Sequence, residues 1–104
     1  MKKLQQGDVI IRSIEKIPDG VKQVSRTARG FVLAEGEATG HAHVIEDDIE
    51  MYEKDGVLFI KADRPVTVKH EEHKPITLSR GVYTISLVRE YDYSNEAITR
   101  RVSD

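Results

Sequence analysis

The 104-residue sequence predicts an all-β protein of a single domain, either a small β-barrel or a β-sandwich. Apolar and polar residues alternate with a period of two through much of residues 7–91, which is typical of strands with one buried face. Turn segments with glycine or proline interrupt the alternation roughly every 8–12 residues, and a helical period is absent from this range. Chains of this length usually form one domain, so we expect residues 1–104 to be one unit, with a β core at about 7–91 and a tail at 92–104.

The expected strands follow one another in short runs. They cover residues 8–14, 21–29, 30–34, 41–45, 49–53, 57–62, 65–70, 76–78 and 82–91. The second run, 21–29, is polar and weakly alternating, and suits a short edge strand followed by a loop. The hairpin over 49–53 and 57–62 has the clearest signal, because Asp-Gly between alternating runs favours a tight turn. In the tail, residues 94–101 suit either a short helix capped by Ser94 or a frayed end.

The composition argues against several functional classes. The chain has no cysteine, which excludes disulfides, iron–sulfur clusters and thiolate zinc sites. A net charge of −2 and the absence of tryptophan give nucleic-acid binding no support. The sequence has neither a signal-peptide pattern nor an apolar run long enough to span a membrane. We therefore expect a soluble, cytoplasmic protein without a membrane partner.

The four histidines fall into two pairs, His41-x-His43 and His70-x-x-His73. Residues i and i+2 of a strand project to the same face, so His41 and His43 should point together. His70 ends a different strand, and a turn after it could bring His73 to its side. Two pairs from separate strands supply the ligands that zinc, iron, manganese or nickel requires. The sequence therefore predicts a divalent-metal site built by all four histidines.

Two glutamates lie inside the second histidine pair. Glu71 and Glu72 offer a carboxylate that could serve as a further metal ligand or as a general base in catalysis. In a catalytic site, an open coordination position would activate water or polarise a substrate oxygen. A metal-free alternative stays open, in which the imidazoles act as a general acid and base, because histidine titrates near neutral pH.

Two sequence motifs resemble those of a known group of proteins. The first is Gly36-Glu37-Ala38-Thr39-Gly40-His41-Ala42-His43. The second is His73-Lys74-Pro75-Ile76-Thr77-Leu78-Ser79-Arg80-Gly81-Val82-Tyr83, followed by Arg89-Glu90-Tyr91. Together they resemble an uncharacterised family of small bacterial and phage-borne proteins. This resemblance covers most of the chain and implies no activity.

A looser resemblance is to the cupins, which are small β-barrels with a metal site. Their first motif carries a glycine, a His-x-His pair, a glutamate and a second glycine. The residues that stand in this order here are Gly36, His41, His43, Glu50 and Gly56. His70 or His73 would complete the ligand set. The resemblance implies a cupin-like β-roll with a histidine metal site.

Three functions are consistent with these observations. The first is a metal-binding β protein, which could be a metal-dependent enzyme acting on an unidentified small molecule. The second is a non-enzymatic assembly module of a mobile element, which would form homo-oligomers through exposed strand edges. The third is a metal-independent phosphodiesterase that uses its histidines as acid and base, although the weak net charge disfavours it. The histidine pairs favour the first function.

Overall fold

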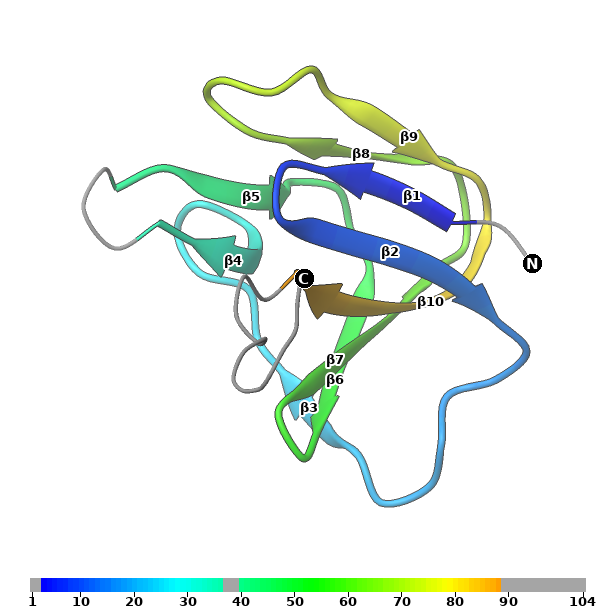
Figure 1. Ribbon diagram of the computed structural model, residues 1–104. Helices are drawn as coiled ribbons and strands as arrows, with labels where there is room; N and C mark the ends of the chain where they lie inside the picture. Colours follow the sequence, from blue (N-terminus) through cyan, green and yellow to red (C-terminus); the bar gives the residue numbers. More distant parts are fainter. Residues whose placement is uncertain (1–2, 37–39, 89–104) are drawn as a thin grey trace, which may run out of the picture.

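The computed structural model describes residues 3–36 and 40–88, and in these ranges the chain is all-β, as predicted (Figure 1). The strands are β1 (Lys3–Gln6), β2 (Val9–Ile14), β3 (Lys22–Val24), β4 (Phe31–Glu35), β5 (Ala42–Ile45), β6 (Glu50–Lys54), β7 (Val57–Ala62), β8 (Val66–Lys69), β9 (Ile76–Leu78) and β10 (Gly81–Leu87). The described ranges contain no helix that could cross a membrane. The tail segment 94–101, expected to be helical or frayed, lies outside the described residues.

The strands form two antiparallel sheets. The first sheet has the order β1-β2-β10-β7-β6-β3, and the second has the order β4-β5-β8-β9. The outermost strands are therefore β1 and β3 in one sheet and β4 and β9 in the other, whereas β10 lies in the interior of its sheet between β2 and β7. Of the two architectures that the sequence predicts, this arrangement corresponds to the β-sandwich.

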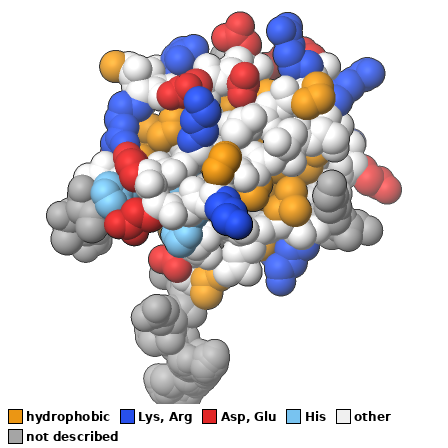
Figure 2. All heavy atoms as spheres, turned by 90° about the horizontal axis from the view of Figure 1, so that it is seen from above, with side chains coloured by type: hydrophobic (Ala, Val, Ile, Leu, Met, Phe, Trp, Pro, Cys, Tyr) orange, Lys and Arg blue, Asp and Glu red, His pale blue; other side chains and the backbone are white. Residues whose placement is uncertain are grey.

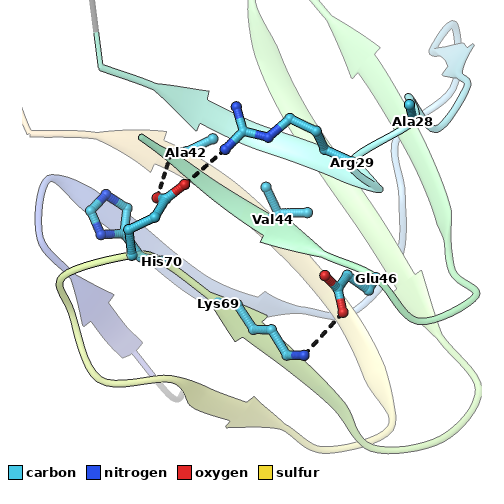
Figure 3. A pocket seen from close by; sticks show the side chains of 8 residues that line it. Ala28, Arg29, Ala42, Val44, Glu46, Lys69 and His70 are labelled. Atoms are coloured by element: carbon cyan, nitrogen blue, oxygen red, sulfur yellow. Dashed lines mark hydrogen bonds and ion pairs between the residues drawn. The ribbon is translucent and has the colours of Figure 1, made fainter. Parts of the chain in front are cut away.

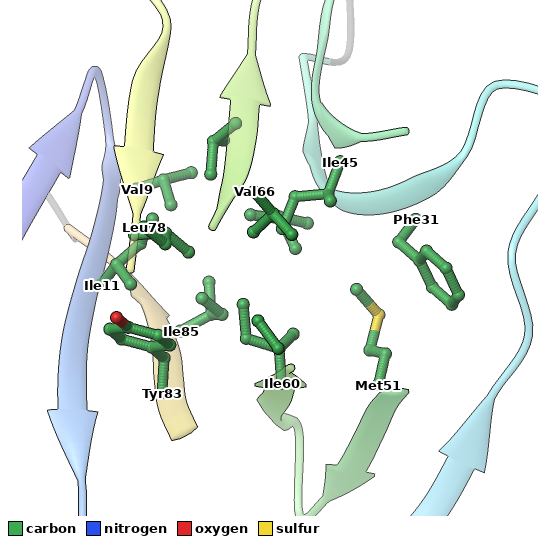
Figure 4. Close-up of a cluster of buried hydrophobic side chains, with 13 residues drawn as sticks. Val9, Ile11, Phe31, Ile45, Met51, Ile60, Val66, Leu78, Tyr83 and Ile85 are labelled. Carbon is green, nitrogen blue, oxygen red and sulfur yellow. The ribbon is translucent and has the colours of Figure 1, made fainter. Parts of the chain in front are cut away.

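Apolar side chains from both sheets fill the space between them (Figure 4). The six-stranded sheet contributes Ile11 and Ile60, and the four-stranded sheet contributes Ile45, Val68 and Leu78, all of them almost completely buried. In β2 and β8 the buried residues alternate with more exposed ones, because successive side chains point to opposite faces of a sheet, whereas all four residues of β5 are buried. Burying this apolar surface is the main force that holds the two sheets together.

The predicted hairpin is confirmed, and the structure defines its register and turn type. β6 and β7 pair from Glu50 opposite Lys61 to Lys54 opposite Val57, which leaves Asp55 and Gly56 as a two-residue turn. Both turn residues have a positive φ, 53° for Asp55 and 80° for Gly56. This is the signature of the type I′ turn, whose twist matches that of the flanking strands.

The first strand was not predicted. β1 is polar in sequence, and it lies before the expected start of the core at residue 7. It pairs with β2 so that Gln6 stands opposite Val9. Gln6 is thereby placed at the buried end of an edge strand, next to a residue of the apolar core.

The interior face of the four-stranded sheet continues into two histidines at one end of the sandwich. Along β5 the interior positions run from Ile45 to His43, and along β8 they run through Val68 toward His70. Val44 stands opposite Lys69 in this pair of strands, so the next step of the register brings His43 opposite His70. The β1–β2 turn and the β8–β9 connection lie at the same end (Figure 1).

Candidate metal centre

The four histidine side chains gather into one cluster, as the sequence predicted. The ring of His70 lies in the middle, with its centroid 4.3 Å from that of His43, 4.6 Å from that of His73 and 5.7 Å from that of His41. The rings of His43 and His73 are nearly parallel and have centroids 5.9 Å apart. The turn after β8 therefore brings His73 beside His70, which the sequence alone left open.

His43 is the most buried member of this histidine cluster, with 8% of its surface exposed. Its Nδ1 lies 2.8 Å from Oε1 of Gln6, which is itself 3% exposed. A β-bulge between Val32 and Ala34 sets Ala34 opposite His43 in the strand pairing. Bulges often re-aim side chains beside functional sites, and this one occurs next to the histidine cluster.

Burial gives His43 an unusual protonation equilibrium. Desolvation, together with the positive charges that His70 and His73 can carry, lowers the pKa of His43 from 6.5 to about 4. The ring is consequently neutral at physiological pH. A neutral imidazole keeps one nitrogen with a free lone pair, which is the form that binds a metal ion.

His70 holds the turn that follows it. Its Nδ1 accepts hydrogen bonds from the backbone N–H groups of Glu72, at 3.0 Å, and His73, at 3.3 Å. A nitrogen that accepts in this way carries no proton, so the neutral ring has its proton on Nε2. His70 thereby fixes the position of its own partner His73.

Glu71 anchors the same turn to the four-stranded sheet. Its Oε1 accepts a hydrogen bond from the backbone N–H of Ala42 at 3.0 Å, and its Oε2 accepts one from Nη2 of Arg29 at 2.9 Å (Figure 3). The pKa of Glu71 lies below its usual value mainly because of the hydrogen bond from Ala42, and then because of one from its own backbone N–H, with smaller contributions from His41 and Arg29. Both carboxylate oxygens thus already have structural partners.

Glu72 occupies a different position, facing the histidines. Its Oε2 lies 3.6 Å from Nδ1 of His41. Glu72 also lines a cleft of about 360 Å³ over the cluster, whereas Glu71 lines a separate hollow on the outer side of β5. Of the two glutamates singled out from the sequence, Glu72 is therefore the one whose side chain borders the cleft.

Two of the histidines and Glu71 already have potential ligand atoms close together. Single ligand atoms of His41, His70 and Glu71 all lie within 4.8 Å of one another. The described residues thus include a group of nitrogen and oxygen donors that could hold a metal ion, with His43 and His73 in contact with the central ring of His70.

The cleft over the cluster is open to solvent and acidic at its border. Figure 2 shows histidine side chains reaching the surface at one side of the molecule, beside acidic side chains. Among the residues that the structure describes, the ionisable ones that line the cleft besides the histidines are Asp8, Glu35 and Glu72. Leu87 and Val88 add an exposed apolar wall. Carboxylates around an opening of this kind favour the approach of cations.

Gly7 brings the β1–β2 turn against His73. Its φ is +57°, and a Cβ added at this position would lie 2.6 Å from Nε2 of His73. Such a contact is too short, so any larger residue would displace the imidazole. The absence of a side chain at Gly7 is what permits the present position of His73.

The sequence indicated the histidines of this site but not all of the residues around them. The burial of Gln6 could not be predicted, because a polar residue in a polar segment indicates an exposed position. Only the pairing of β1 with β2 shows otherwise. Glu50, which the cupin resemblance placed in the site motif, lies elsewhere: it accepts a hydrogen bond from Tyr52 at 2.6 Å and lines a different hollow. The cupin ligand order therefore does not describe this site.

The fold and the cluster define a class of small two-sheet β domains with a histidine-lined cleft at one end. Within that class, the chain belongs to a family described as a domain of unknown function, DUF8820, whose model matches residues 5–87. The matched region includes all four histidines and Gln6. No curated protein and no solved structure showed a significant match to the chain.

We predict that Gly7→Ala moves the ring of His73, whereas Gly56→Ala does not. Both glycines have a positive φ, so each substitution should lower the free energy of unfolding by about 1–2 kcal/mol. Only at Gly7 does the new Cβ meet the imidazole, because Gly56 has nothing within 4 Å. Ring resonances in NMR spectra should shift for His73 in the first variant alone. Unchanged His73 resonances in folded Gly7→Ala protein would contradict the contact.

A second prediction concerns the stability of metal-free protein in acid. An unfolded histidine binds a proton near pH 6.5, but folded His43 does so only near pH 4. Unfolding therefore takes up a proton between these values, and the free energy of unfolding should fall as the pH drops through this window. Urea denaturation from pH 7 to pH 5 should show a shallower fall in His43→Asn. Equal slopes for both proteins would show that His43 does not cause the effect.

Proposed function

We propose that this protein binds one divalent transition-metal ion at the histidine cluster. The observation that carries the proposal is the convergence of all four imidazole rings, which come from the start of β5 and from the end of β8 and its following turn. Chance clustering is a weak explanation, because these are all the histidines of the chain. We propose His41, His43, His70 and His73 as the ligands.

The spacing of the rings supports this proposal. Imidazoles that share one ion through bonds of about 2.0–2.1 Å have ring centres on the order of 4.5–5.5 Å apart. The ring of His70 lies 4.3–5.7 Å from the other three rings, and the rings of His43 and His73 lie 5.9 Å apart, so these four separations bracket that range. An ion could therefore be accommodated by rotations of the side chains, without a change in the sheets.

The donor set supports a borderline metal. Several imidazoles with a nearby carboxylate suit zinc, iron, manganese or nickel, whereas calcium and magnesium prefer oxygen ligands alone. The low pKa of His43 keeps its ring neutral, so a metal does not have to compete with a proton there. Asp8, Glu35 and Glu72 around the cleft would offset the positive charge of the ion.

The open cleft supports a site that also takes a ligand. Structural zinc sites are closed by protein groups, but here a space of about 360 Å³ lies directly over the histidines. Water or a small molecule could reach the ion through it. Glu72 borders this space beside His41 and offers a carboxylate that could accept a proton from such a ligand.

The metal proposal predicts that untagged protein retains close to one ion per chain after dialysis. His43→Ala and His70→Ala should lose most of it, because partners that merely orient ligands already contribute about 10–100-fold to metal affinity and direct ligands contribute at least as much. Glu46→Gln is the matched control, since Glu46 pairs with Lys69 on the outer side of the same sheet. Elemental analysis with circular dichroism checks both content and folding. Substoichiometric metal that is the same in all four proteins would refute the proposal.

The hydrogen bonds of His70 generate a further prediction. If a metal binds Nε2 of His70, the ring proton must move to Nδ1, and if a metal binds Nδ1, it takes the lone pair of that nitrogen. In both cases Nδ1 can no longer accept the hydrogen bonds from the backbone N–H groups of Glu72 and His73. Addition of zinc should therefore shift the amide resonances of Glu72 and His73. The amides of Asp55 and Gly56, in a remote turn, serve as the control. Unshifted amides at saturating zinc would remove His70 from the ligand set.

A further inference from the structure

Gln6 is a buried polar residue whose position the fold makes unusual. It ends the edge strand β1, yet only 3% of its surface is exposed. The preceding residue, Gln5, has the same side chain but an exposed position, where its Nε2 donates to the carbonyl of Gly7 at 3.0 Å. The two glutamines therefore offer the same chemistry on opposite sides of one strand.

The hydrogen bonds of Gln6 determine the orientation of its amide. Its Nε2 donates to the carbonyl of Val68 at 3.0 Å and to the carbonyl of Lys74 at 2.8 Å. These two bonds use both protons of the amide nitrogen. Turning the amide over would set its oxygen against two carbonyl oxygens and leave buried groups without partners, which is unfavourable.

This orientation leaves only Oε1 of Gln6 to face His43. Oε1 accepts and cannot donate, so the Nδ1 of His43, 2.8 Å away, must carry the proton of that hydrogen bond. The nitrogen without a proton in the neutral ring is then Nε2. The backbone carbonyls of Val68 and Lys74 thus select the tautomer of a histidine through the Gln6 amide.

We propose that Gln6 is a positioning residue that holds His43 as the Nδ1–H tautomer and presents its Nε2 lone pair to the cluster. Metal-binding histidines generally donate their other ring N–H to a fixed acceptor, which sets the ring orientation and raises ligand basicity. The choice of tautomer at His43 follows from the hydrogen bonds of Gln6 alone. The consequence of that tautomer for metal affinity rests on the proposed function.

The tautomer is tested first in metal-free protein at pH 7.5. Long-range ¹H–¹⁵N NMR correlations distinguish a proton on Nδ1 from one on Nε2. Wild-type His43 should have its proton on Nδ1, Gln5→Met should match it, and Gln6→Met should show partial or full transfer to Nε2. A wild-type ring with its proton on Nε2 overturns the inference, and this result requires no variant to fold. An unchanged tautomer in folded Gln6→Met overturns it as well.

Zinc affinity is tested next by titration of the same three proteins. Gln6→Met should bind zinc roughly 10–100-fold more weakly than wild type, which is the usual effect of losing such a partner, and Gln5→Met should stay within about twofold. A changed tautomer with unchanged affinity overturns the role of Gln6 in presenting Nε2. Failure of wild-type protein to bind zinc refutes the proposed function instead, while the tautomer measurement still decides whether Gln6 controls His43.

Discussion

The buried amide of Gln6 joins the two sheets at the end of the sandwich where the histidines gather. It reaches from β1 of one sheet to the carbonyl of Val68 in β8 of the other and to that of Lys74 beyond it. The oxygen of this amide forms a hydrogen bond with Nδ1 of His43. A buried polar group is tolerated only when its hydrogen bonds are made, so β1, β8 and the ring of His43 constrain one another.

The histidine cluster is an extension of the apolar core. The alternation that buries Ile45 and Val68 continues by one step to His43 and His70, and antiparallel pairing sets these two strands side by side. A second set of bonds, centred on Glu71, fastens the turn that carries His73 to the backbone of Ala42. Rigid strands thus position two of the rings, and a hydrogen-bonded turn positions a third, which is the kind of support a preorganised site needs.

Much of the fold followed from local patterns, but the surroundings of the histidines did not. Alternation and Asp55-Gly56 were enough to predict the central hairpin, because the turn chemistry and the strand period agree. β1 was missed, since its sequence is polar and its pairing with β2 is evident only in the folded chain. The convergence of the histidines was predicted, but the tautomers of His43 and His70 depend on Gln6 and on backbone N–H groups that only the folded chain brings near.

We propose that four histidines from two separated segments form one metal-binding site. The most direct measurement is a crystal structure of zinc-loaded protein with anomalous diffraction data collected at the zinc edge. We expect one anomalous peak at the end of the sandwich where the histidines gather, about 2.0–2.1 Å from ring nitrogens of at least three of the four histidines. A protein that crystallises at saturating zinc with no peak there, or with zinc bound only elsewhere, would contradict it.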